Sequence, residues 1–347
     1  MSNSNPATTT DPATTTMIDP ATTTSFREAL AKSTQLAILA GAGLSTGSGI
    51  PTFTGQLGGV PFTYSLDEKF ATAQAFKEDP VRVWRFHHSI RKRCLNASPN
   101  AAHKALGALH ADPSLRSKLL RKLEEPTSSP LFITQNVDNL SLDVLSSLKS
   151  SEEGGGGGQG KINKEQYQES KNRLIEMHGN IFRQECLQCR HVSTSSDTNL
   201  AFEDDSLDKT NSSSEADVNN AQVRVITEDD LPRCGGPPNQ KDVDSSTTTN
   251  RYYGHCKGKL RPAVTWYGEI PQGLGDIGRY LNSTDMLIIV GASPLAHPAA
   301  GFIRTVKERG GKVAVFHLEP SDADKDADWV FLGRCEEVLP RVLGLDS

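Results

Sequence analysis

A short apolar segment at residues 36–40 (LAILA) runs directly into a glycine-rich turn at 41–49, and the pair leaves few folds open to the chain. Further apolar segments at 131–133, 286–290 and 313–316 are bounded by Pro, Gly or charged residues and are separated by helix-like stretches. Segments this short and apolar are typical of strands that are buried on both faces. Their alternation with helices predicts an α/β fold with a doubly wound parallel sheet.

The glycine-rich turn reads Gly41-Ala42-Gly43-Leu44-Ser45 at its start. Glycines between a strand and a helix let the backbone approach a pyrophosphate, and free N–H groups at the helix start add positive potential. The turn is therefore similar to a dinucleotide-binding loop, although its G-x-G-x-x-x-G spacing differs from the ordinary dehydrogenase fingerprint. A tight turn that binds no ligand is the alternative.

Four of the six cysteines are spaced as metal ligands, because Cys186 and Cys189 form a C-x-x-C knuckle and Cys234 and Cys256 follow it. Four thiolates suit one tetrahedral Zn²⁺, and a site closed by four cysteines would be structural rather than catalytic. The alternative is a redox C-x-x-C pair with two bystanders. Two other cysteines lack a partner at this spacing and are predicted to be free thiols: Cys94 and Cys335.

Polar residues follow the apolar segment at 131–133, in the sequence TQNVD at 134–138. Ligands of doubly wound sheets lie at the carboxyl ends of strands, where we expect Asn136 and Asp138 to recognise a nicotinamide carboxamide and a ribose. His178, in a His-Gly-Asn sequence shortly before the knuckle, is a candidate general base because imidazole titrates near neutral pH. A purely structural histidine is the alternative.

The charge balance argues against direct binding of nucleic acid, because 37 Lys and Arg face 42 Asp and Glu, for a net charge of −5. No apolar run approaches the ~18 residues that span a membrane. The first 25 residues hold no Lys or Arg and match neither a secretion signal nor an Arg-rich transit peptide. We expect a soluble protein of the cytosol or nucleus, and the mitochondrion stays open.

Composition also predicts which segments lie outside the folded core. Residues 1–25 form a Thr/Pro/Ala repeat and are predicted to be a disordered tail. Residues 148–172 contain a run of glycines followed by a polar stretch, and are predicted to be a flexible insert whose second half has a helix-compatible composition. Residues 193–250 are acidic and rich in Ser, Thr and Asn, which predicts disordered insertions around the last two knuckle cysteines.

Taken in order, the motifs GAGLSTGSGIPTF, TQNVD, HGN, CxxC…C…C, VTWYGE, GAS and GRCEEVLP strongly resemble those of the sirtuins, NAD-dependent protein-lysine deacylases, from about residue 26 onward. The PTF, LPRC and VTWYGE sequences most resemble the branch that removes negatively charged acyl groups. The resemblance implies a Rossmann-like domain at 26–178 and 262–347, with a helical module at about 55–98. It also implies a zinc module at 179–261.

The resemblance implies transfer of the acyl group from a protein or peptide lysine to ADP-ribose, with release of nicotinamide and His178 as the base. Its cofactor-binding residues would be Gly41, Ala42, Gly43, Ser45, Phe53, Gln135, Asn136, Val137, Asp138, Gly291, Ser293 and Cys335. Its substrate strand would contain Val264, Trp266, Gly268 and Glu269. A mono-ADP-ribosyltransferase of the same fold and a non-enzymatic NAD- or zinc-dependent binding module are the alternatives. The oligomeric state is not predicted.

Several positions depart from the sirtuin pattern. Thr54 stands where sirtuins carry an Arg near the cofactor, His317 replaces an Asn at the adenosine ribose, and Ser141 replaces a His. The acidic-acyl branch uses a Tyr-x-x-Arg pair, and these positions are His87 and Ile90 here. We therefore expect a preference for neutral acyl groups, with some tolerance of acidic groups if His87 is protonated at low pH. The alternative is a pocket rebuilt around Arg91, the residue after Ile90.

Overall fold

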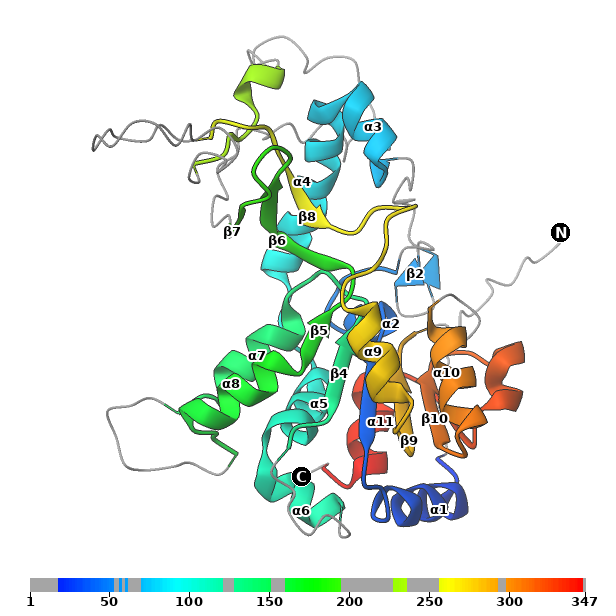
Figure 1. Ribbon diagram of the computed structural model, residues 1–347. Coiled ribbons are helices and arrows are strands. Elements are labelled where there is room, and N and C mark those ends of the chain that lie inside the picture. Colours follow the sequence, from blue (N-terminus) through cyan, green and yellow to red (C-terminus); the bar gives the residue numbers. More distant parts are fainter. Residues whose placement is uncertain are drawn as a thin grey trace, which may run out of the picture.

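A six-stranded parallel sheet forms the centre of the larger part of the molecule (Figure 1). The computed structural model describes residues 18–52, 56–57, 60–61, 70–120, 128–150, 160–194, 227–235, 256–292 and 298–345. The strands are β1 (Leu36–Ala40), β4 (Leu131–Thr134), β5 (Leu174–Glu176), β9 (Met286–Val290), β10 (Lys312–His317) and β11 (Trp329–Leu332). Their order is β11-β10-β9-β1-β4-β5, so the chain winds outward in both directions from β1 and the switch point lies between β1 and β9.

Helices cover both faces of this sheet, as the alternating apolar segments predict. On one face lie α9 (Leu274–Leu281) and α10 (Ala299–Glu308), which pack on inward side chains such as Leu39 and Ile289. On the other face lie α1 (Pro20–Leu30), α5 (Ala101–Ala111) and α11 (Cys335–Leu343), around Ile38 and Phe316. The helices α6 (Pro113–Leu119) and α7 (Leu140–Leu148) follow α5 and β4 in the chain. The doubly wound fold is confirmed.

A smaller module with its own antiparallel sheet stands at the top of Figure 1. Its strands are β7 (Val192–Thr194), β6 (Gly179–Cys186) and β8 (Leu260–Val264), in that order. The helices α3 (Ala73–Glu78) and α4 (Pro80–Asn96) pack against it, and the Trp84 indole N–H donates to the Leu260 carbonyl at 3.1 Å. The helical module and the cysteine module therefore share one core, and the predicted boundary at 261–262 falls inside β8.

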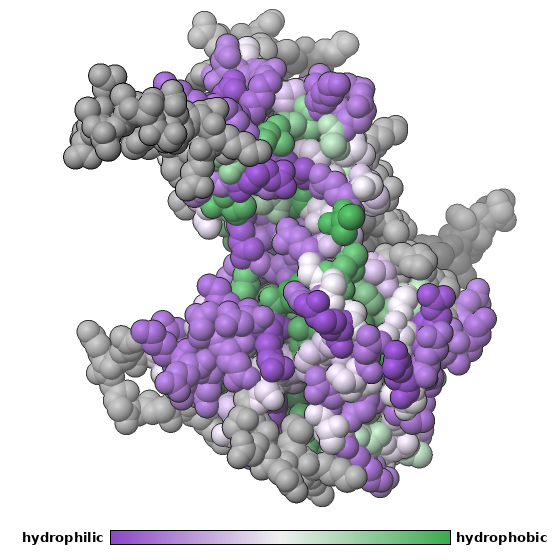
Figure 2. Space-filling view, in the orientation of Figure 1, coloured by the Kyte–Doolittle hydropathy of each residue, from purple (hydrophilic) through white to green (hydrophobic). Residues whose placement is uncertain are grey.

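The remaining elements are short. They are α2 (Gly43–Thr46), the hairpin strands β2 (Gln56–Leu57) and β3 (Val60–Pro61), and the 3₁₀ turns η3 (Glu228–Asp230) and η5 (Asp322–Asp326). Among the described helices, none is both long enough and apolar enough to cross a membrane. Figure 2 shows hydrophilic side chains over most of the described surface, with hydrophobic ones concentrated at the waist between the larger part and the smaller module.

The predicted disordered tail ends too late, because α1 begins at Pro20 rather than after residue 25. The Asp19 carboxylate caps this helix by accepting from the backbone N–H groups of Ala21 and Thr22, and Pro20 suits a first helical position. Phe26 then anchors the helix in the core. The repeat composition hid this start signal, and residues 1–17 lie outside the described residues.

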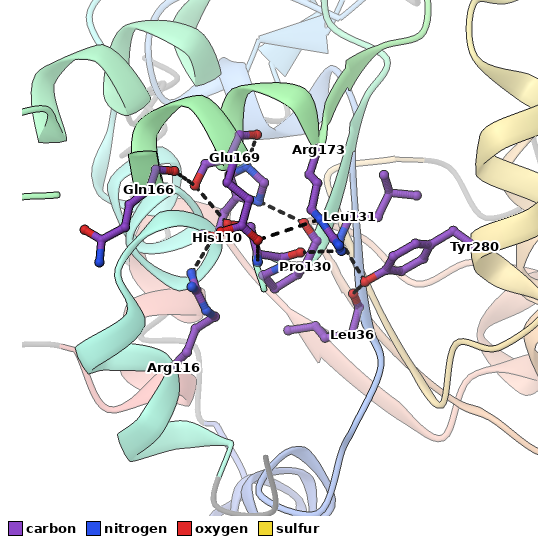
Figure 3. Close-up of polar contacts among 11 residues, drawn as sticks. Leu36, His110, Arg116, Pro130, Leu131, Gln166, Glu169, Arg173 and Tyr280 are labelled. Carbon is purple, nitrogen blue, oxygen red and sulfur yellow. Dashed lines mark hydrogen bonds and ion pairs between the residues drawn. The ribbon is translucent and has the colours of Figure 1, made fainter. Parts of the chain in front are cut away.

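The second half of the predicted flexible insert is part of the folded body. Residues 164–172 form α8 (Lys164–Asn172), and Asn163 and Gln166 complete a capping box at its start. The buried His110 ring fixes α8, because it lies 2.9 Å from the Ser170 carbonyl and 3.1 Å from the Pro130 carbonyl. Figure 3 shows His110 among its polar contacts, with Gln166 and Glu169 of α8 nearby. Residues 151–159, 195–226 and 236–255, which include the predicted acidic insertions, lie outside the described residues.

Candidate functional site

Two glycine-containing loops meet at the switch point of the sheet. The Gly43 N–H donates to the Gly291 carbonyl at 2.8 Å, and a Cβ added to Gly43 would lie 2.8 Å from the Gly291 Cα. Gly291 has a φ of +64°, and a Cβ there would collide with the backbone nitrogen of Leu44. Only glycine permits this approach. The predicted loop residues Gly41, Ala42 and Gly43 therefore lie where open α/β sheets bind ligands.

A buried polar cluster links this loop to the end of β4. The Ser45 hydroxyl donates to the Asp138 carboxylate at 2.6 Å, and the Asn136 amide donates to Ser45 and to the Gly41 carbonyl, both at 3.0 Å. Burial raises the pKa of Asp138, and its bonds from Ser45 and the Leu140 N–H oppose that shift. The Gln135 amide and the Asn136 carbonyl oxygen take no part in these bonds. The loop and the TQNVD segment thus form one hydrogen-bonded unit.

His178 lies two residues after the end of β5, beside this unit. Its Nδ1 is 3.0 Å from the Gln135 carbonyl oxygen, and because a carbonyl only accepts, Nδ1 carries the hydrogen and Nε2 is left to accept a proton. Burial lowers the pKa of His178, although the Gln135 bond opposes the shift. Gly179 has a φ of +80°, and a Cβ there would collide with the Ala263 carbonyl. Glycine is therefore required directly after His178 by the geometry of the turn.

Two residues that the sequence analysis did not single out support the same cluster. His103 is buried, with its Nε2 3.4 Å from the Ser45 hydroxyl. The Asn100 amide donates to the Leu44 carbonyl at 2.8 Å and to the Ser48 hydroxyl at 3.1 Å, while its oxygen caps α5. Asn before an apolar helical stretch is an N-cap signal, so Asn100 was readable from the sequence.

The predicted substrate segment leaves β8 at Val264 and passes between the two parts of the molecule. The Thr265 N–H donates to the His178 carbonyl at 2.8 Å, so the segment touches the backbone of the candidate base. Trp266 is buried, and Gly268 turns the chain with a φ of +86°. The Glu269 carboxylate is held by Arg261 and by the Trp266 N–H, which makes it a structural anchor of this turn.

The two predicted acyl-pocket positions lie on the face of α4 that meets this segment. His87 is buried; its Nδ1 lies 2.8 Å from the Val83 carbonyl, and its Nε2 accepts from the Trp266 indole at 3.3 Å. Burial lowers the pKa of His87 to about 4. Ile90 is partly buried against the same apolar cluster. The neighbouring Arg91 is buried and donates from Nε to the Ile181 carbonyl at 3.0 Å.

The predicted metal ligands meet at the end of β6. The Cys186 and Cys256 sulfurs lie 3.7 Å apart, the Cys189 and Cys234 sulfurs lie 3.6 Å apart, and all four are within 4.8 Å of one another. A tetrahedron with Zn–S bonds of about 2.3 Å places its sulfurs about 3.8 Å apart. The donor set fits one structural Zn²⁺ better than a pair of adjacent redox thiols, because each knuckle cysteine lies near a distant one.

The other predicted positions divide into two groups. Val137 and Cys335 are described: Val137 accepts from the Ile181 N–H at 2.9 Å, and Cys335 starts α11 inside the apolar core, where burial raises its pKa to about 12. His317 ends β10, with Nε2 3.1 Å from an Asp324 carboxylate oxygen. The positions outside the described residues are Phe53, Thr54 and Ser293.

Known proteins of one family are similar to this chain. The Sir2 family model matches residues 41–148 and 163–298, so the unmatched residues 149–162 are what remains of the predicted insert. An "NAD-dependent protein deacylase" of Daphnia pulex is 31% identical over 90% of this chain and 93% of its own length. The Xenopus laevis protein named "NAD-dependent protein deacylase sirtuin-5A, mitochondrial" is also 31% identical, over 90% of this chain and 82% of its own.

Solved structures agree as well. A crystal structure of a Sir2 homologue–NAD complex is 25% identical, covers 92% of each chain and has a TM-score of 0.60. The chain described here belongs to the Sir2 family.

Proposed function

We propose that this chain, an NAD-dependent protein deacylase of the Sir2 family, removes acetyl and longer aliphatic acyl groups from lysine in preference to succinyl or malonyl groups. The observation that carries this proposal is that neither acyl-pocket position on α4 offers a cation. His87 is neutral with both ring nitrogens engaged, and Ile90 is apolar. A buried succinyl carboxylate would need a charge-assisted partner.

Arg91 supports the same preference. It lies one residue after Ile90, about 100° round the helix, and its Nε bond to Ile181 directs the guanidinium towards the backbone of β6. The low-pH tolerance of acidic groups predicted for His87 loses its basis, because protonation of Nε2 would break the bond from Trp266 and the pKa of His87 is about 4. A pocket that uses Arg91 for acidic acyl groups is the outcome that the experiment must distinguish.

In this reaction His178 acts as the general base. The Gln135 carbonyl fixes the tautomer, so Nε2 takes a proton, and the lowered pKa keeps the ring neutral at neutral pH. Asn136 and Ser45 are held in place by Asp138, which orders the crevice before a substrate enters. NAD, when bound, supplies the ribose that receives the acyl group and loses nicotinamide.

The residues present fit NAD. Gly43 and Gly291 lack a Cβ, which lets the two loops meet at the switch point, where open α/β sheets bind nucleotides. We assign the loop residues Gly41, Ala42, Gly43 and Ser45 to the pyrophosphate, Gln135 and Asn136 to the ribose, and Val137 and Asp138 to nicotinamide. Gly291 and Cys335 are assigned to the adenosine side, and Phe53 and Ser293 remain predictions. Zn²⁺, held by the four cysteines, would stabilise the smaller module without taking part in the chemistry.

The test measures kcat/KM for acetyl-, butyryl- and succinyl-lysine peptides of one sequence, by nicotinamide release. We expect the acetyl and butyryl peptides to react faster than the succinyl peptide. Faster succinyl removal would overturn the acyl preference, and its loss in Arg91→Met would then identify the residue responsible. Mass spectrometry of the same peptides separates deacylation from ADP-ribosylation, because transfer of ADP-ribose would add mass to the peptide.

The substrate is an acyl-lysine protein, since the relatives are protein deacylases. The compartment stays a prediction: the sequence favours cytosol or nucleus, whereas the sirtuin-5 relatives carry the word mitochondrial in their names. Localisation of a tagged full-length chain by fluorescence microscopy would decide between them.

A further inference from the structure

Arg261, on β8, is a buried cation. Its side-chain hydrogen bonds in the described residues go to the neighbouring Pro262 carbonyl and to the predicted substrate segment, residues 264–269. Arg261 is 7% exposed. Its guanidinium donates to the Val264 carbonyl at 2.8 Å and to both carboxylate oxygens of Glu269, at 2.5 and 2.9 Å. A buried guanidinium is costly unless it is paired in good geometry, and this fork supplies such a pair.

The same guanidinium stacks on the indole of Trp266, with its central carbon 3.5 Å from the ring centroid. This indole donates to His87, which in turn bonds to the backbone of α4. Arg261, Val264, Trp266 and Glu269 therefore form one unit, here called the Arg261 clamp. The clamp joins β8 to the acyl-pocket face of α4.

The clamp adds to two backbone hydrogen bonds that already hold residues 264–269 in place. The Thr265 N–H binds the His178 carbonyl, and the Tyr267 N–H binds the Ala71 carbonyl at 2.9 Å. Glu269 adds the third tie, because its carboxylate accepts from the Trp266 N–H at 2.8 Å. Burial alone would raise the pKa of Glu269, but the bonds from Arg261 and Trp266 outweigh it and lower that pKa, so the carboxylate stays charged in the clamp.

We propose that Arg261 is a positioning residue for the acylated substrate: it fixes the shape of segment 264–269 and touches neither substrate nor cofactor. The inference rests on the proposed function, since it takes this segment to be the one that pairs with the substrate backbone. An added strand binds through main-chain groups that must stand at fixed spacing, so a loose segment weakens binding without changing the chemistry. In the part of the chain that the structure describes, the clamp shares no hydrogen bond with the glycine loops or Asp138.

The experiment compares the wild-type protein with Arg261→Met, Arg261→Lys and Glu269→Gln, and uses Arg279→Met, an exposed arginine on α9, as control. We expect Arg261→Met to raise KM for an acetyl-lysine peptide by about tenfold or more, with KM for NAD and kcat nearly unchanged. Arg261→Lys keeps the charge but loses the planar fork, so it should raise the peptide KM less. The Glu269→Gln and Arg261→Met effects should not add in the double variant.

Zinc content shows that each variant keeps its folded module. The inference is wrong if Arg261→Met binds one zinc per chain and its KM for the peptide is unchanged. It is also wrong if the KM values for the peptide and for NAD rise by the same factor. If Arg261→Met does not fold, the same comparison is made with Arg261→Lys and Glu269→Gln. Affinity for a fluorescent acetyl-lysine peptide is measured in parallel. A wild-type protein that binds this peptide but releases no nicotinamide would refute the proposed reaction and leave the clamp testable by affinity, and one that binds no peptide would refute both.

Discussion

At the scale of single residues, the reactivity of His178 depends on which ring nitrogen holds its hydrogen, and the Gln135 carbonyl decides this. We expect His178→Ala to lose about 10²–10⁴-fold in kcat, because a general base contributes that much, while NAD still binds. Nicotinamide release and calorimetric NAD binding provide the two readouts. His191→Ala, an exposed histidine of the smaller module, is the matched control and should behave as wild type. Full turnover in His178→Ala would rule out the assigned role.

At the scale of elements, α8 shows how a polar helix is held against the larger part of the molecule. Its capping box and the buried contacts of Ser170 hold it in place. Asn163→Ala should lower the free energy of unfolding by about 0.5–2 kcal/mol, as the loss of an N-cap does, without changing kcat. Chemical denaturation measures this, with the exposed Lys164→Ala as control. Equal stability of the two variants would mean that the cap does not hold α8.

The metal knuckle is the second element with a clear test. Cys186 ends β6, so loss of its thiolate should release the metal and destabilise the smaller module by several kcal/mol. For Cys186→Ser we expect less than one zinc per chain and a lower melting temperature. Leu187→Ser changes an exposed neighbour in the same knuckle and should retain the metal. A folded, active Cys186→Ser protein with a full zinc complement would contradict the four-cysteine site.

For the whole molecule, three buried histidines link stability to pH. Burial lowers the pKa of His87, His103 and His110 to about 4, from 6.5. Between these values the unfolded chain binds protons that the folded protein does not, so stability is complete above pH 6.5 and falls as the pH drops towards 4. Each histidine accounts for at most about 3 kcal/mol. His110→Gln keeps a donor but cannot titrate, so its denaturation midpoint should depend less steeply on pH than that of wild type or of His191→Gln.

A feature of the fold or of the site could be predicted from the sequence when neighbouring residues alone determine it. Four of the sheet strands (β1, β4, β9 and β10), the loop at Gly41 and the four cysteines could be predicted, because each is encoded within a few residues. The short strands β5 and β11 were not predicted. The start of α1 was missed although the Asp19-Pro20 cap is local, since the surrounding repeat suggested disorder. The neutral, fully hydrogen-bonded form of His87 could not be predicted, because its Nε2 partner, Trp266, lies 179 positions away in the chain.

The strand β6 begins one residue after His178 and ends on Cys186. At about 3.3 Å per residue it forms a rod of roughly 25 Å between the base and the knuckle. Cys189 and Cys256 are only half-buried at its far end, so alkylating or oxidising reagents would displace a bound Zn²⁺ without reaching the residues assigned to NAD. Thiol-reactive compounds in an inhibitor screen would then register as active although they never compete with either substrate. Screening against this enzyme therefore calls for a counter-assay that follows zinc release.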